Sequence, residues 1–136
     1  MKKIILASIL LAAPLSFGFT LKVSGLKAGN QGVYRCLVFN SADGFPGTPS
    51  KALQSVNGTL ANGAGECVFM NLPAGTYAIS SFQDENSNGK IDKNLLGMPT
   101  EKYGFSNDAS KPFGPPEFSA ASFQLSQDTI IKINLK

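Results

Sequence analysis

Two segments of the chain alternate strictly between apolar and polar side chains. Residues 19–24 read FTLKVS and residues 129–135 read TIIKINL, so an apolar residue recurs at every second position in each. A period of two with β-branched residues is typical of strands that bury one face. The alternation predicts these inward-facing side chains: Phe19, Leu21 and Val23 in the first strand, and Ile131, Ile133 and Leu135 in the second.

Turn residues divide the sequence between these segments into further short runs. Asn57-Gly58 and Asn62-Gly63 are dipeptides typical of hairpins, and residues 25–32 form a turn region. After residue 18, no window of about eleven or more residues carries a helical apolar stripe. We therefore predict an all-β fold, an antiparallel β-sandwich of about seven strands. Its other strands are expected at residues 32–40, 66–71, 76–82 and 121–125, with a weaker one near 51–56.

Two stretches do not have the pattern of strands. Residues 41–49 are rich in Gly and Pro, and a longer irregular stretch runs from Asp84 to about Phe118. A loop of that length is unusual in a compact domain. It therefore indicates either a functional loop or an element that the pattern does not reveal.

The first 18 residues have the pattern of a secretory signal peptide. A basic start at Lys2-Lys3 is followed by an apolar run over residues 4–13, and small residues lead up to Gly18. The apolar run is about half the roughly 20 residues that a transmembrane helix needs, which disfavours a membrane anchor. We expect cleavage after Gly18 and an exported protein, periplasmic or secreted. Residues 19–136 would then form a single β-sandwich domain with no membrane span.

The composition excludes several classes of function. The 136 residues contain no His, which rules out Ser-His-Asp and Cys-His catalysis and His-ligated metal or haem sites. Removal of the leader takes Lys2 and Lys3 away, so Lys+Arg falls from 12 to 10 against 9 acids, and the net charge falls from +3 to +1. The remaining Lys residues are scattered. We therefore expect no nucleic-acid partner, because such binding needs a concentrated positive surface.

Cys36 and Cys67 both lie in strand-like runs. An exported chain meets an oxidising compartment, where two Cys usually pair. On the chain-entropy model the bridge would contribute roughly 3–4 kcal/mol. The alternative is two separate buried thiols. A catalytic thiol is disfavoured because no His is present to activate it.

The sharpest motif is DENSNGKID at residues 84–92. Ca²⁺ takes about six to eight oxygen ligands, and an EF-hand-type loop supplies them at alternate positions around a Gly at its sixth position. Gly89 stands at that sixth position, and Ile91 is expected to point into the core. The candidate ligands are Asp84, Asn86, Asn88, the backbone carbonyl of Lys90, and Asp92.

The motif lacks its last ligand, because Leu95 stands where an EF-hand has a bidentate Glu. Glu101 and Asp108 are the nearest candidates for an extra ligand. The motif resembles the Asp/Asn-rich calcium loops of β-sandwich surface-protein repeats, and its neutral amides imply modest affinity. The alternative is a plain turn in which Asn and Asp bond their own backbone. Both interpretations stay open.

Four segments together resemble a family of small exported bacterial proteins whose function is unknown. They are LPAGTYA at residues 72–78, DENSNGKID at 84–92, GMPTEKYGFSN at 97–107 and PPEFSAA at 115–121. Gln83 stands where members of that family often have His. The resemblance extends over residues 21–135. It implies a transthyretin-like or immunoglobulin-like sandwich, and it implies no activity, because none is assigned to the family.

Four aromatic residues lie among prolines in the long irregular stretch: Tyr103, Phe105, Phe113 and Phe118. One interpretation is a rigid aromatic loop that binds a peptide, a glycan or a protein partner. The other is that the rings fold back and cover one end of the sandwich. We favour the second, because a loop so rich in Phe is expected to bury most of it.

The sequence predicts a non-catalytic binding or structural module of the cell envelope, contacting an unknown envelope protein or polymer. The alternative is a carboxylate-dependent, glycosidase-like hydrolase acting outside the cytoplasm. Such an enzyme needs a cleft, two carboxylates and one raised pKa. Two carboxylates flanking a pocket would favour the enzyme, whereas acids converging on one point around the turn at residues 86–89 would favour an ion. The acids available to it are Asp84, Glu85, Asp92, Glu101 and Asp108.

Overall fold

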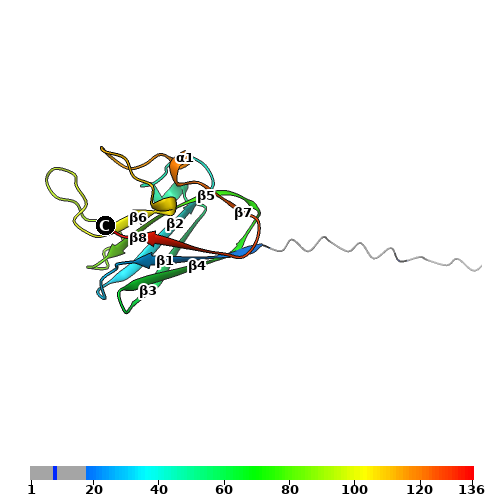
Figure 1. The fold of residues 1–136 in the computed structure, drawn as a ribbon, viewed down its shortest axis with the longest axis horizontal. Coiled ribbons are helices and arrows are strands. Elements are labelled where there is room, and N and C mark those ends of the chain that lie inside the picture. Colours follow the sequence, from blue (N-terminus) through cyan, green and yellow to red (C-terminus); the bar gives the residue numbers. More distant parts are fainter. Residues whose placement is uncertain (1–7, 9–17) are drawn as a thin grey trace, which may run out of the picture.

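The computed structural model describes residue 8 and residues 18–136, so the expected signal peptide lies almost entirely outside the described residues. Within them the fold is all β, as predicted, with short helical turns between strands (Figure 1). The first strand begins at Phe19, the residue expected to follow the cleavage site. The elements are β1 (Phe19–Leu26), β2 (Val33–Phe39), η1 (Pro49–Lys51), β3 (Gln54–Ala61), β4 (Ala64–Leu72), β5 (Gly75–Asp84), β6 (Tyr103–Phe105), η2 (Ser106–Asp108), α1 (Phe118–Ala121), β7 (Phe123–Leu125) and β8 (Thr129–Asn134).

The strands form one sheet in the order β6-β5-β2-β3-β4-β1-β8, and β7 pairs separately with β5. All pairs are antiparallel except β1 with β8, which is parallel from Leu21↔Thr129 to Leu26↔Asn134. This one departure from an antiparallel sandwich arises because the chain crosses from β7, beside β5, to the free edge of β1. Parallel neighbours need such a crossover.

The sheet curls until its two ends meet. The N–H of Tyr103, at the start of β6, donates to the carbonyl of Lys136 at 3.1 Å, and the N–H of Lys136 donates back to the carbonyl of Tyr103 at 2.9 Å. These reciprocal bonds join β6 to the segment after β8. The result is a nearly closed sheet whose two halves face each other across the core.

Strand β3 makes the corner between the two halves. Its first part, up to Gly58, pairs with β2, and its last part, from Thr59 to Ala61, pairs with β4. A Cβ on Gly58 would overlap the carbonyl oxygen of Glu66 and the Sγ of Cys67. Asn57 and Gly58 lie inside strand β3, so the prediction of a hairpin turn at this pair is wrong. Gly58 is needed here because the backbone of β4 passes too close for a side chain.

The Asn62-Gly63 pair does form the predicted hairpin, between β3 and β4. Both residues have positive φ, 53° and 75°, as a tight two-residue turn of this kind requires.

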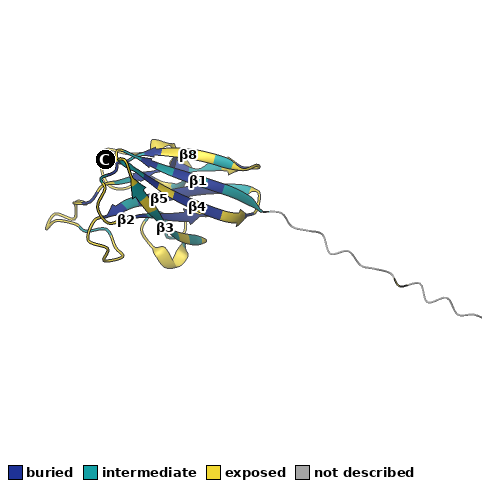
Figure 2. Cartoon of the chain, turned by 90° about the horizontal axis from the view of Figure 1, so that it is seen from below, coloured by how far each residue is buried: buried dark blue, intermediate teal, exposed yellow. Residues whose placement is uncertain are grey.

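The core lies between the two halves of the sheet, as the dark strands in Figure 2 show. Cys36 of β2 and Cys67 of β4 form the predicted disulfide across it, with Cα atoms 6.5 Å apart and 31 positions apart in the chain. Both Cys are buried. The largest fully buried apolar side chains are Tyr34, Phe39, Phe69, Leu21, Leu72, Ile79, Leu125 and Ile133.

A second, smaller apolar cluster covers the outer face of β2 and β5. Phe45 stands at its centre, with its ring edge-on to Phe39 at 5.4 Å, Phe118 at 5.9 Å and Phe105 at 6.1 Å between centroids. The cluster also includes Ala78 and Ala121 with the partly buried Tyr103 and Ala109. The long stretch after Asp84 is therefore a second layer, and it contains β6 and η2.

Candidate functional site

Asp84 ends β5 and anchors the predicted calcium motif. Its side chain is fully buried, and Oδ2 accepts a hydrogen bond from Nε of Arg35 at 2.5 Å and another from the N–H of Gly89 at 2.8 Å. Oδ1 accepts the N–H of Asn88 at 3.1 Å, which leaves that oxygen able to accept a further partner.

Opposing effects act on the pKa of Asp84. Burial raises it, but the hydrogen bond from Arg35, the backbone N–H groups of Gly89 and Asn88, and the charge of Arg35 together lower it below the ordinary value. Asp84 is therefore ionised at neutral pH. Arg35 also donates from Nη1 to Oδ1 of Asn57 at 2.6 Å, so its guanidinium is fixed beside the carboxylate.

The remaining polar side chains of the motif gather on Asp92. Nδ2 of Asn86 donates to Oδ2 of Asp92 at 2.5 Å, and Nδ2 of Asn88 donates to Oδ1 of Asp92 at 2.7 Å. The Oδ1 atoms of the two Asn side chains accept the N–H groups of Asn88 at 3.3 Å and Lys90 at 3.1 Å. Asn86, Asn88 and Asp92 therefore meet at one exposed turn, whose N–H groups also bind Asp84.

Glu101 closes this turn into a loop. Its carboxylate is buried, with Oε1 accepting the N–H of Glu85 at 3.0 Å and Oε2 accepting the N–H of Asp92 at 2.9 Å. The N–H of Thr100 donates to the carbonyl of Asp92 at 2.9 Å. Of the two extra ligands considered, Glu101 therefore lies at the loop. Asp108 is held elsewhere, where it accepts the N–H and the Nδ2 of Asn134, both at 2.8 Å.

Residues 18–136 contain no group of three or more acidic or Cys side chains arranged to hold a metal. A cation at the motif would therefore depend on amide and backbone oxygens as well as Asp84 and Asp92. Ile91 is half-buried and does not belong to the core clusters, so the prediction that it points into the core is wrong. It lines a neighbouring groove instead.

That groove has a volume of about 860 Å³ and lies on the outer face of β2, β5 and β6. Leu37, Phe82 and Tyr103 form apolar parts of its lining, and its walls are the loop after β5 and the segment 109–116. Asp108 is the one acidic side chain that lines it among the described residues, whereas four lysines do: Lys90, Lys93, Lys111 and Lys136. A two-carboxylate hydrolysis mechanism finds no pair of acidic side chains here.

Three of the four aromatic residues singled out in the sequence, Tyr103, Phe105 and Phe118, belong to the smaller apolar cluster, and Phe113 lies apart from it. Phe105 is buried and Phe118 is half-buried, and both pack against Phe45. Tyr103 is half-buried and lines the groove. Phe113 is 89% exposed at the end of its loop. The structure therefore does not bring the four rings together as one surface.

Sequence reasoning missed Arg35 and the groove lysines. Arg35 is the single Arg of the chain and pairs with a residue 49 positions away, so no local pattern reveals it. The lysines are separated in sequence and come together only where the two loops approach each other.

None of the helices among the described residues has the length and hydrophobicity to cross a bilayer.

Comparison with known proteins supports one assignment. Neither curated proteins nor solved structures gave a match. A family model does match, over residues 21–132 of the 136, and this confirms the family resemblance predicted from the sequence. The chain belongs to DUF2141, a family of uncharacterized proteins conserved in bacteria.

Proposed function

We propose that this protein is an exported, non-catalytic binding or structural module of the cell envelope, stabilised by a Ca²⁺ ion in the loop formed by residues 84–92. The observation that carries the proposal is the meeting of Asn86, Asn88 and Asp92 at one exposed turn that Asp84 anchors from below. Oxygen-bearing side chains gathered in this way supply the hard ligands that Ca²⁺ prefers.

The donor set suits a weakly bound cation. For Oδ1 rather than Nδ2 to face the point shared with Asp92, the amides of Asn86 and Asn88 must each turn over, and each then gives up the backbone N–H that its Oδ1 accepts. Asp84 Oδ1 and the carbonyl of Lys90 complete the set of predicted ligands. Only two of these ligands are charged and Arg35 lies beside one of them, so we expect affinity in the range of extracellular modules, with a Kd of about 10⁻⁴–10⁻³ M.

The disulfide supports export. Cys36 and Cys67 are paired inside the core, and such bridges persist in oxidising compartments and are rare in the cytosol. A bridge between the two halves of the sheet also stiffens a small domain against unfolding outside the cell.

The hydrogen bonds already made by the acidic side chains favour a binding module over the hydrolase. Both oxygens of Glu101 and both oxygens of Asp108 already accept hydrogen bonds from the protein itself. The pKa of Asp84 is lowered, whereas a general acid in glycoside hydrolysis needs a raised one.

Thermal unfolding with added cation tests the proposal. At about 10 mM Ca²⁺ and a Kd of about 1 mM, the folded state gains about 1.4 kcal/mol, which raises the Tm by about 6 °C for a domain of this size. Mg²⁺ should give a smaller shift, because it demands stricter geometry and holds its waters. Asp92→Ala should abolish the Ca²⁺-dependent shift, and the matched control Asp108→Ala should keep it. No shift in the unmodified chain, or an equal shift in Asp92→Ala, would contradict the proposal.

A further inference from the structure

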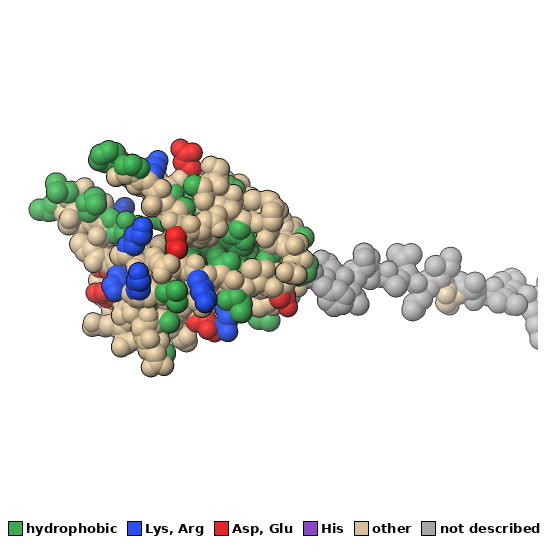
Figure 3. Space-filling model, viewed as in Figure 1, with side chains coloured by type: hydrophobic (Ala, Val, Ile, Leu, Met, Phe, Trp, Pro, Cys, Tyr) green, Lys and Arg blue, Asp and Glu red, His purple; other side chains and the backbone are tan. Residues whose placement is uncertain are grey.

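The three most exposed large apolar side chains of the described chain, Leu95, Leu96 and Phe113, lie on two adjoining loop tips, and Met98 lies on the first tip with the two leucines. Leu95 is 105% exposed, Leu96 87%, Met98 58% and Phe113 89%. Both loops project at one end of the molecule, and Figure 3 shows apolar side chains at their tips with basic side chains beside them. Single exposed apolar residues are ordinary, but a cluster of them marks an interaction surface.

The first tip is held in shape by its own hydrogen bonds. Oδ1 of Asn94 accepts the N–H groups of Leu96 at 2.9 Å and Met98 at 3.0 Å, and the N–H of Asn94 donates to the carbonyl of Met98 at 2.9 Å. A bridge between Lys93 and Pro99 closes the loop below. Leu95 and Leu96 are therefore presented outward by an ordered loop, which lowers the entropy lost on binding.

The second tip is stiffened by proline. Phe113 lies between Pro112 and Gly114, and Pro115 and Pro116 follow. Gly114 has a φ of 76°, which turns the chain directly after the exposed ring. Phe113 is therefore presented outward on a restricted backbone, as the two leucines are on the neighbouring tip.

Positive charge lies between the tips. Lys90, Lys93 and Lys111 line the groove that the two loops share. None of them takes part in an ion pair among the described residues. The one acidic side chain of the groove, Asp108, already accepts two hydrogen bonds from Asn134. A ligand that complements this end of the molecule therefore carries both negative charges, for the lysines, and apolar groups, for the loop tips.

The direction of the apolar side chains selects a membrane surface over an acidic peptide. Leu95, Leu96 and Phe113 do not line the groove, so a peptide bound there would leave all three in water. A bilayer surface would receive the apolar tips at the boundary of headgroups and acyl chains while its phosphates face the lysines.

We propose that this end of the protein docks on the surface of an anionic phospholipid bilayer. Leu95, Leu96 and Phe113 enter the interface, and Lys90, Lys93 and Lys111 contact lipid phosphates. The inference goes beyond the proposed function and does not depend on the calcium ion, because the hydrogen bonds that shape the first tip lie outside residues 84–92.

Vesicle co-sedimentation tests the docking. The chain from Phe19 onward, which contains every strand that the structure describes, is mixed in EDTA with vesicles of phosphatidylglycerol and phosphatidylcholine or of phosphatidylcholine alone. EDTA keeps the result separate from the calcium proposal. We expect binding to the anionic vesicles that is at least about tenfold tighter than to the neutral ones. Equal binding to both, or no binding to either, would overturn the proposal, and the second result would leave a protein partner as the occupant.

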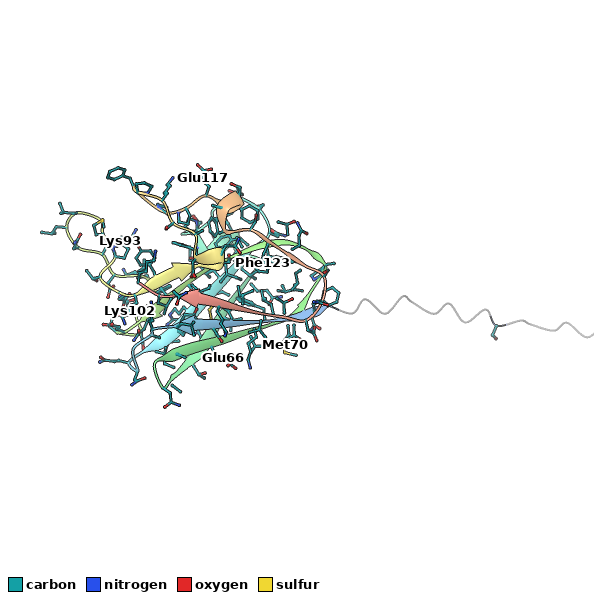
Figure 4. All side chains as sticks on the ribbon, in the orientation of Figure 1. Glu66, Met70, Lys93, Lys102, Glu117 and Phe123 are labelled. Atoms are coloured by element: carbon teal, nitrogen blue, oxygen red, sulfur yellow. A yellow bond between two sulfur atoms is a disulfide. The ribbon has the colours of Figure 1, made fainter. Side chains whose placement is uncertain are left out.

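Matched variants locate the contact. The triple variant Leu95→Ser/Leu96→Ser/Phe113→Ser should bind at least about tenfold more weakly. Met70→Ser/Ile130→Ser removes side chains that are 62% and 65% exposed on β4 and β8, and it should bind like the unmodified chain. Figure 4 shows Met70 far from Lys93 and the tips. Equal loss in both variants would contradict the assignment of the tips.

Charge variants test the role of the lysines. Lys93→Gln/Lys111→Gln should weaken binding to anionic vesicles at least about tenfold at low salt. The control Lys22→Gln/Lys132→Gln removes the same charge from β1 and β8 and should leave binding nearly unchanged. An equal effect of the two pairs would show that net charge alone drives binding, and would overturn the proposal.

A fluorescent reporter gives an independent readout. The chain contains no Trp, so Leu95→Trp introduces a single reporter at the first tip. Its emission should shift to the blue on anionic vesicles, whereas that of Met70→Trp should not. An unshifted Leu95→Trp spectrum on vesicles that carry the protein would show that the tip stays in water.

Discussion

The carboxylate of Glu101 fixes the position of Asp92 by accepting its backbone N–H at 2.9 Å, while its other oxygen accepts the N–H of Glu85 at 3.0 Å. One buried side chain thus joins the two ends of the loop that carries the predicted calcium motif. The geometry of the motif therefore depends on a residue that lies outside it in sequence.

Replacing Glu101 with Gln should destabilise the fold by about 1–3 kcal/mol, because one buried N–H would then face an amide NH₂ instead of an oxygen. Urea unfolding measures the change in the free energy of unfolding. The control is Glu117→Gln, an exposed acid in the second loop (Figure 4), which should change stability by less than about 0.5 kcal/mol. Equal stability of the two variants would show that the Glu101 bonds do not hold the loop.

The ion pair of Asp84 with Arg35 predicts a loss of stability in acid. The folded-state pKa of Asp84 lies below its ordinary value of 3.8, so the pair contributes its full stability above about pH 4. That contribution falls as the pH drops below the unfolded pKa and is gone below the folded one. Urea unfolding from pH 7 to pH 2 should show this fall.

Asp84→Asn should remove that part of the acid-dependent loss and destabilise the protein by about 2–4 kcal/mol at neutral pH, because it leaves Arg35 without its partner. Asp43→Asn breaks the exposed pair with Lys51 and should cost less than about 1 kcal/mol. A pH profile unchanged by Asp84→Asn would contradict the account of this pair.

The disulfide should be complete in the purified protein. Thiol titration of the denatured, unreduced chain should find no free thiol. Cys36→Ala/Cys67→Ala should lower the free energy of unfolding by about 3–4 kcal/mol, since the bridge closes a loop with a sequence separation of 31 residues. Two titratable thiols in the unreduced protein would refute the bridge.

Gly58 should tolerate no side chain, because a Cβ would meet the Glu66 carbonyl and the disulfide sulfur at the corner of β3. Gly58→Ala should destabilise by about 1–3 kcal/mol or more through this overlap. Gly47→Ala is the matched control, since no atom lies within 4 Å of its added Cβ, and it should be neutral or slightly stabilising. Thermal unfolding of the two variants compares them, and a neutral Gly58→Ala would mean that the corner is wider than the structure has it.

Local patterns predicted the strands well because alternation and turn residues act within a few positions. The alternating segments became β1 and β8, whereas the weak run expected near residues 51–56 overlaps only the first residues of β3. The parallel pairing of β1 with β8 was not predicted, because the path of the connecting chain decides it. Strand β6 is three residues long and depends on partners in β5 and at Lys136, so its own sequence gives no alternating signal.

The return of aromatic rings onto the sheet was the favoured interpretation of the long stretch, but the elements and contacts of this second layer could not be predicted, for the same reason. Ser106 shows the cause, since its hydroxyl accepts the N–H of Ile79 at 2.8 Å and donates to the carbonyl of Ala121 at 2.5 Å. One side chain thereby fastens α1 to β5 through contacts that are distant in sequence. The motif at residues 84–92 was recognisable because its spacing is local. Glu101 was one of two candidates for an extra ligand, and in the structure its carboxylate accepts backbone N–H groups of the loop.

An NMR titration with Ca²⁺ tests the central claim most directly. The proposal predicts that the backbone amide signals of residues 84–92 move in a saturable way with a midpoint of about 10⁻⁴–10⁻³ M, and that signals from the hairpin at Asn62-Gly63 stay in place. Asp92→Ala should abolish the change. Signals that stay unmoved up to about 10 mM Ca²⁺, or that drift equally across the whole chain, would contradict a calcium site in this loop.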